Sequence, residues 1–185
     1  MSAAGALAIS LSLALLACQI DVGGPAAPGE PIAASGQSAS EVAQIWQGAL
    51  TAALRTGQLT VLFDEQQLTS YFAARAAARE ESFLQEPQVY LRDGLIQIHG
   101  VTRQGALQAS VLITVAPRLD PEGGLTFELT SADFGPLPVP EAVRASISTI
   151  LTEALTTPLG SLATGVRITS VAIADGQMAL VGELR

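Results

Sequence analysis

The sequence predicts an α+β fold, in which a curved antiparallel meander sheet carries three helices packed on one face. Apolar residues recur at the helical period between residues 41 and 80, and at alternate positions from Pro87 onward. Two Asp-Gly pairs, Asp93-Gly94 and Asp175-Gly176, lie between alternating segments and indicate two-residue β-hairpins. A long antiparallel sheet twists, so we expect it to wrap around a helix.

The N-terminal segment is predicted to be a lipoprotein signal peptide spanning residues 1–17. Its apolar run ends in Leu15-Leu16-Ala17-Cys18, which is similar to a bacterial lipobox. In such a sequence the chain is cut before the cysteine, and the thiol is acylated. Cys18, the only cysteine, is therefore the expected lipid-attachment site, with acyl chains such as palmitate anchoring the protein to a bacterial membrane outside the cytoplasm. The alternative is an ordinary apolar helix with a buried cysteine, and the first five residues lack the usual cation.

Two further regions follow this segment. Residues 18–40 are rich in Gly, Pro, Ala and Ser, a composition typical of a flexible tether. Residues 41–185 suffice for a single α+β domain with its own hydrophobic core. The net charge of −8 argues against binding to nucleic acid and against electrostatic docking to anionic lipid. We therefore expect membrane attachment to depend on the anchor.

The first half of the domain is predicted to be mainly helical. A first helix over residues 41–56 has one apolar stripe and ends at Gly57, and a short strand over 59–63 follows it. Asp64 then has the pattern of a helix N-cap, and Gln67 completes a capping box at the start of a helix over residues 65–80.

The second half is predicted to be mainly strands. Alternating segments indicate strands that begin near Pro87 and continue over residues 95–102, 106–116 and 125–129. Prolines between residues 136 and 140 predict an extended connector to a third amphipathic helix over residues 141–155. The chain is then expected to end in a hairpin of strands 165–174 and 177–184.

The sequence offers little catalytic chemistry. His99 is the only histidine, and its alternation with Ile98 predicts that it faces solvent or a sheet edge, on the same strand face as Gln97. With no second histidine, no lysine and no free thiol, neither an activated nucleophile nor a metal cluster is expected. The acidic residues Asp120 and Glu122 have the setting of turn residues. We therefore predict no catalytic residue, no metal site, no cofactor and no enzymatic activity.

Aliphatic side chains dominate the rest of the domain, and they suit acyl chains, which need apolar area and little directional bonding. The candidate ligand-binding residues lie on the longest strand, the strand after it and the third helix: Val111, Ile113, Val115, Phe127, Val143, Ile147, Ile150 and Leu151. A fully packed core would produce the same pattern, so pattern alone does not decide between the two.

The order of elements resembles that of the LmeA-like and YpmS-like families of secreted or lipid-anchored bacterial proteins. The resemblance covers residues 58–184 and is carried by these segments: Leu62 to Leu68, Val89 to Gly100, Leu125 to Leu129, Gly135 to Pro140, and Ile173 to Gly176. It implies binding of phospholipid or another lipid in the cell envelope, by a domain resembling half of a tubular lipid-binding domain. It supplies no catalytic residues. The alternative is a non-enzymatic scaffold lipoprotein with a packed core and an envelope protein as its partner.

Overall fold

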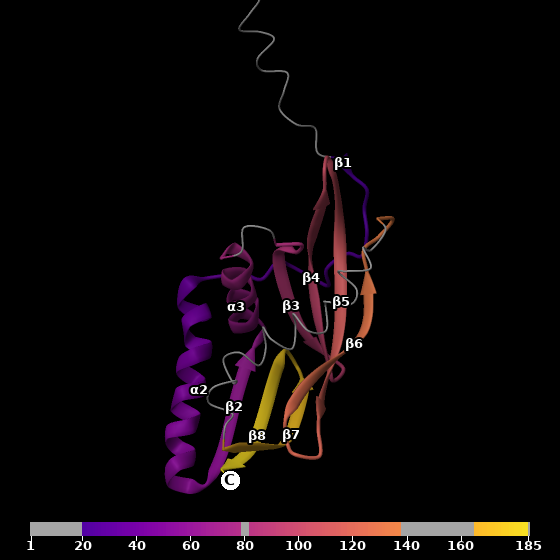
Figure 1. Ribbon diagram of the computed structural model, residues 1–185. Helices are drawn as coiled ribbons and strands as arrows, with labels where there is room; N and C mark the ends of the chain where they lie inside the picture. Colours follow the sequence, from indigo (N-terminus) through magenta and orange to yellow (C-terminus); the bar gives the residue numbers. More distant parts are fainter. Residues whose placement is uncertain (1–19, 79–81, 138–164, 185) are drawn as a thin grey trace, which may run out of the picture.

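The computed structural model describes residues 20–78, 82–137 and 165–184 (Figure 1). These residues form two helices and eight strands, which confirms the α+β class; the predicted third helix, residues 141–155, lies outside them. In chain order the elements are β1 (Ile20–Asp21), α2 (Gly36–Thr56), β2 (Gln58–Asp64), α3 (Glu65–Ala77), β3 (Gln85–Arg92), β4 (Leu95–Gln104), β5 (Leu107–Leu119), β6 (Leu125–Asp133), β7 (Val166–Ala174) and β8 (Gln177–Leu184).

The strands form two sheets, so the predicted single meander is wrong in this respect. In the five-stranded sheet β5 is flanked by β4 and then β3 on one side, and by β1 and β6 on the other. In the three-stranded sheet β8 lies between β2 and β7. The prediction assumed that strands adjacent in sequence pair with each other. Instead β2 pairs with β8 along its whole length, from Gln58 opposite Glu183 to Asp64 opposite Gln177.

Both predicted Asp-Gly hairpins are confirmed. Asp93 and Gly94 join β3 to β4 with φ values of 53° and 76°, and Asp175 and Gly176 join β7 to β8 with 50° and 76°. Positive φ at both central residues is the requirement of a type I′ turn, and Asp-Gly meets it at low cost. A third tight turn at Gly105 (φ 62°) joins β4 to β5.

The helices begin where side-chain caps are available. The hydroxyl of Ser35 accepts a hydrogen bond from the Ser38 amide, so α2 begins at Gly36, five residues before the predicted start. At the start of α3 the predicted capping box is present, because Asp64 and Gln67 each bind the other's backbone amide. In Figure 1, α2 lies beside α3 and β2, and α3 lies beside β3.

Several residues between Ile20 and Ile32, in the segment predicted to be a flexible tether, bond to the five-stranded sheet. β1 pairs with β5 in parallel, with Ile20 opposite Leu107. The segment then passes behind β5, β4 and β3 in Figure 1 and reaches α2. The side chain of Gln88 bonds both backbone groups of Ile32, at 2.6 and 3.2 Å. These contacts join the segment to residues distant in sequence, which its glycine and proline content did not predict.

Buried side chains of both sheets and both helices form one hydrophobic cluster, which includes Trp46. The two sheets are joined at their borders by backbone hydrogen bonds from Ile168 to Gly123 (2.9 Å) and from Gly176 to Leu91 (3.3 Å). The sheets therefore curl around a common core, consistent with the predicted curvature.

Candidate functional site

Four of the predicted ligand-binding residues lie together on β5 and β6. Val111, Ile113 and Val115 are completely buried, and Phe127 is 3 % exposed. Ile113 lies opposite Ile98, and Val115 lies opposite Ile96, so the same aliphatic surface continues onto β4. We call Val111, Ile113, Val115 and Phe127 the apolar wall.

The other four predicted residues, Val143, Ile147, Ile150 and Leu151, lie outside the described residues. Across the core, the described elements that share the cluster with the apolar wall are also apolar. They contribute side chains from both helices and the three-stranded sheet, including Trp46, Leu59, Phe72, Ile173 and Leu180. The wall is therefore part of a continuous interior made of hydrocarbon side chains.

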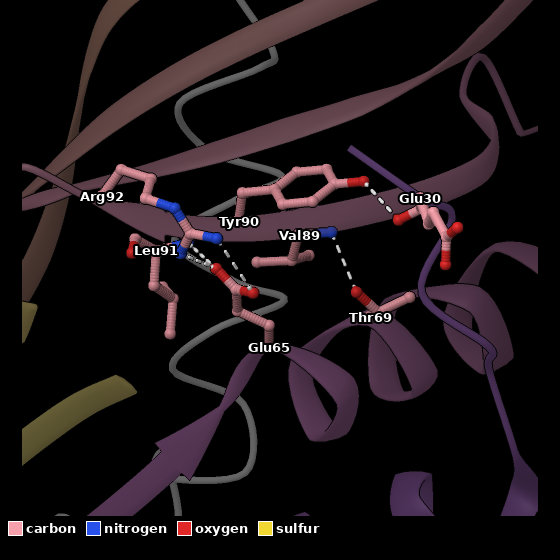
Figure 2. Close-up of polar contacts among 7 residues, drawn as sticks. All are labelled: Glu30, Glu65, Thr69, Val89, Tyr90, Leu91 and Arg92. Carbon is pink, nitrogen blue, oxygen red and sulfur yellow. Dashed lines mark hydrogen bonds and ion pairs between the residues drawn. The ribbon is translucent and has the colours of Figure 1, made fainter. Parts of the chain in front are cut away.

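A polar junction joins the first two turns of α3 to β3 (Figure 2). The carboxylate of Glu65 accepts a hydrogen bond from the Leu91 amide at 2.8 Å and forms an ion pair with Arg92. One turn later, the Thr69 hydroxyl accepts a hydrogen bond from the Val89 amide at 2.9 Å. The two side chains thus satisfy the backbone donors of β3 that do not face β4.

Sequence reasoning did not identify this junction. Glu65 and Thr69 are four residues apart, so they lie on one face of α3. That spacing is a weak signal, since it does not reveal which strand the face meets. The Leu91 carbonyl completes the junction by accepting hydrogen bonds from Arg92 (2.8 Å) and from Gly176 at the β7–β8 turn (3.3 Å).

His99 was predicted to face solvent or a sheet edge, and this prediction is wrong. As predicted, the His99 side chain lies on the other face of β4 from that of Ile98. It is nevertheless only 5 % exposed. The segment leading to α2 crosses that face, where the Tyr90 hydroxyl donates to the Glu30 carbonyl (3.4 Å, Figure 2). The His99 ring packs edge-on against Tyr90 at 5.4 Å, and neither ring nitrogen has a hydrogen-bond partner among the described residues. Burial lowers the pKa of His99 and favours the neutral ring.

Several of the described acidic residues lie in turns or at a helix cap. Asp93 and Asp175 occupy the hairpin positions that were predicted for them. The Asp120 carboxylate accepts a hydrogen bond from the Gly124 amide at 2.6 Å, as expected of a turn residue. Within the described ranges, no three histidine, cysteine or acidic side chains gather closely enough to hold a metal ion. No helix in those ranges is both long and apolar enough to cross a bilayer.

A search of curated proteins gave no match. The model of the LmeA-like phospholipid-binding family matches residues 29–183, which is most of the chain and includes the apolar wall. The chain therefore belongs to the LmeA-like phospholipid-binding family.

Proposed function

We propose that this protein is a lipid-anchored envelope protein that binds phospholipid, or another acyl-chain ligand, against the apolar wall. The family match supports a lipid ligand. The observation that carries the site is the complete burial of Val111, Ile113 and Val115 on one face of β5, without a polar side chain between them on that face. Such a surface offers dispersion contacts and no directional bonds, which suits a hydrocarbon tail.

In this proposal the ligand lies between the apolar wall and the apolar residues predicted opposite it, Val143, Ile147, Ile150 and Leu151. The proposed role is non-enzymatic, in keeping with the phospholipid-binding family that the chain matches. The anchor is the acylated Cys18, which holds the protein outside the cytoplasm at a bacterial membrane. The competing proposal is a scaffold lipoprotein with a packed interior and an envelope protein partner.

Native mass spectrometry of protein purified in mild detergent tests the ligand. A co-purifying phospholipid, together with uptake of a fluorescent acyl probe, supports lipid binding. A clean apo mass without uptake supports the packed scaffold.

Variants locate the site. Val111→Phe should reduce probe uptake because the ring projects into the space proposed for the tail. Val61→Phe is the matched control, since Val61 is equally buried but lies on β2 beside α2. Each variant should lower the free energy of unfolding by about 1–3 kcal/mol through overpacking. Equal loss of uptake in both would contradict the assignment to the apolar wall. Ile147→Trp tests the opposite side and should also reduce uptake while the fold is retained.

A further inference from the structure

We propose that the domain rests on the phospholipid bilayer through the end of the β4–β5 hairpin, in one fixed orientation. We call this surface the hairpin tip and define it as Ile20 together with residues 103–107. The proposal rests on the acylated Cys18 of the proposed function. It adds a specific contact surface and replaces the predicted free tether with a short connection.

The chain between the proposed anchor and the fold is short. Ile20 is the second residue after Cys18, and two residues span at most about 7 Å. The headgroup layer on each side of the hydrocarbon core is about 5–8 Å thick. A flexible tether over residues 18–40 would instead have an average extent of about 25 Å. An acylated Cys18 therefore places Ile20 within or beside the headgroup layer.

β1 is attached to the β4–β5 hairpin by backbone hydrogen bonds. The Ile20 amide donates to the Ala106 carbonyl at 2.9 Å, and the Val22 amide donates to the Gln108 carbonyl at 2.9 Å. Further along, the Ser110 amide donates to the Gly23 carbonyl at 3.1 Å. The chain thus enters the domain directly beside the β4–β5 turn. Wherever Cys18 is held, the hairpin tip is held with it.

The segment after β1 cannot detach from the domain, and so lengthen the connection to the anchor, without losing several contacts. A Cβ atom at Gly24 would lie 2.4 Å from the Ser110 carbonyl oxygen, so the two backbones are in close contact. The Gln88 side chain bonds the Ile32 backbone in both directions, and the Ser35 amide donates to the Ser70 hydroxyl at 3.0 Å. These contacts hold the segment to β5, β3 and α3.

The chemistry of the hairpin tip suits a bilayer surface. Ile20 is 55 % exposed, and Leu107 opposite it is only partly buried. Arg103 is exposed, and residues 102–108 contain no acidic side chain although the chain carries a net charge of −8. An apolar side chain can enter the boundary of the acyl region, and a guanidinium can bind lipid phosphate. The carboxylate of Asp21, next to Ile20, accepts a hydrogen bond from the Gly23 amide at 2.8 Å.

Depth-dependent fluorescence quenching tests this orientation. The acylated full chain is placed in vesicles of phosphatidylcholine and phosphatidylglycerol that contain nitroxide-labelled headgroups. With Cys18 acylated, one introduced cysteine is the only free thiol. A fluorophore at Ala106→Cys should be strongly quenched, whereas one at Gln58→Cys should not, because the α2–β2 turn lies at the opposite end of the molecule (Figure 1). Equal quenching at the two positions would overturn the proposal.

Two further variants separate the parts of the argument. A Gly/Ser insertion between Gln19 and Ile20, as long as the predicted tether, should keep the protein on the vesicles and remove most of the quenching at position 106. Ile20→Ser should reduce that quenching by weakening the contact. Quenching that is unchanged in both variants would contradict the roles of the short connection and of Ile20.

The outcome is independent of ligand binding. Mass spectrometry that finds no acyl group on Cys18 would overturn the anchor and this orientation together. An acylated protein with equal quenching at both positions would overturn the orientation alone. Uptake of the acyl probe by the Cys18→Ser variant in solution measures lipid binding separately from either result.

Discussion

The Glu65 carboxylate accepts a hydrogen bond from the Leu91 amide at 2.8 Å, across 26 positions of the sequence. The same carboxylate forms an ion pair with the Arg92 guanidinium. That guanidinium also donates a hydrogen bond to the Leu91 carbonyl. Together with Thr69, the Glu65 side chain therefore holds α3 against the five-stranded sheet. A hydrogen bond from a backbone donor to a charged acceptor contributes more to stability than one between neutral groups.

Glu65→Ala should lower the free energy of unfolding by about 2 kcal/mol, because it leaves the Leu91 amide and the Arg92 guanidinium without this acceptor. Chemical denaturation measures the change. Glu128→Ala is the matched control, since Glu128 also pairs with an arginine, Arg118, at 2.8 Å, but both side chains are mostly exposed. That pair should contribute less than about 1 kcal/mol. Similar losses in the two variants would mean that the amide contact adds nothing.

Gly24→Ala should loosen the segment that leads to α2. Its Cβ would meet the Ser110 carbonyl oxygen at 2.4 Å, so one of the two backbones must move. Amide hydrogen exchange at Val22 and Ser110 should then become faster. Gly29→Ala is the control, because Gly29 also has a positive φ, 111°, but open space around it. Protection that is unchanged in Gly24→Ala, or equally lost in both, would show that this contact does not hold the segment.

His99 should make the domain sensitive to mild acid. Its pKa in the folded state lies below the ordinary value of 6.5 because burial disfavours the charged ring. The unfolded chain therefore binds a proton first as the pH falls below about 6.5, and the stability of the fold falls with it. Above that pH the ring is neutral in both states, and the effect is absent.

His99→Phe removes the titrating group and keeps a ring against Tyr90. Denaturation midpoints at pH about 7.5 and 5.5 measure the effect, in a range above the ordinary titration of the carboxylates. The unmodified protein should lose stability between the two values, and the variant should lose less. An equal loss in both would show that other groups cause the sensitivity.

Cys18→Ser should release the protein from membranes, because the acylated thiol is the proposed anchor. Fractionation of cells into membrane and soluble material measures the effect. Ser12→Ala, in the same apolar N-terminal run, should leave attachment unchanged and serves as the control. Continued sedimentation of the Cys18→Ser variant with membranes would refute the anchor.

Local chemistry made parts of the fold predictable from the sequence. The Asp64 cap with Gln67, and the two Asp-Gly turns, depend on contacts or backbone angles within a few residues. The inward face of β5 was also correct for Val111, Ile113 and Val115, because alternation along a strand follows from backbone geometry. These features need no knowledge of distant partners.

The parts that were not predicted depend on partners far along the chain. Pairing of β2 with β8 joins residues near position 60 to residues near position 180. Burial of His99 requires the crossing segment, whose composition suggested disorder. The role of Thr69 depends on the position of Val89, 20 residues away. No local pattern carries these relationships, so the α3–β3 junction appears only in the structure.

The α3–β3 junction also affects how copies of this protein meet. Unpaired amides along an outer strand invite pairing with a strand from another molecule, which can lead to polymerisation. Here the amides of Val89 and Leu91 already donate to side chains of α3. Even when many copies are crowded together, this border of the sheet cannot recruit a neighbour's strand at those two amides unless α3 first moves away.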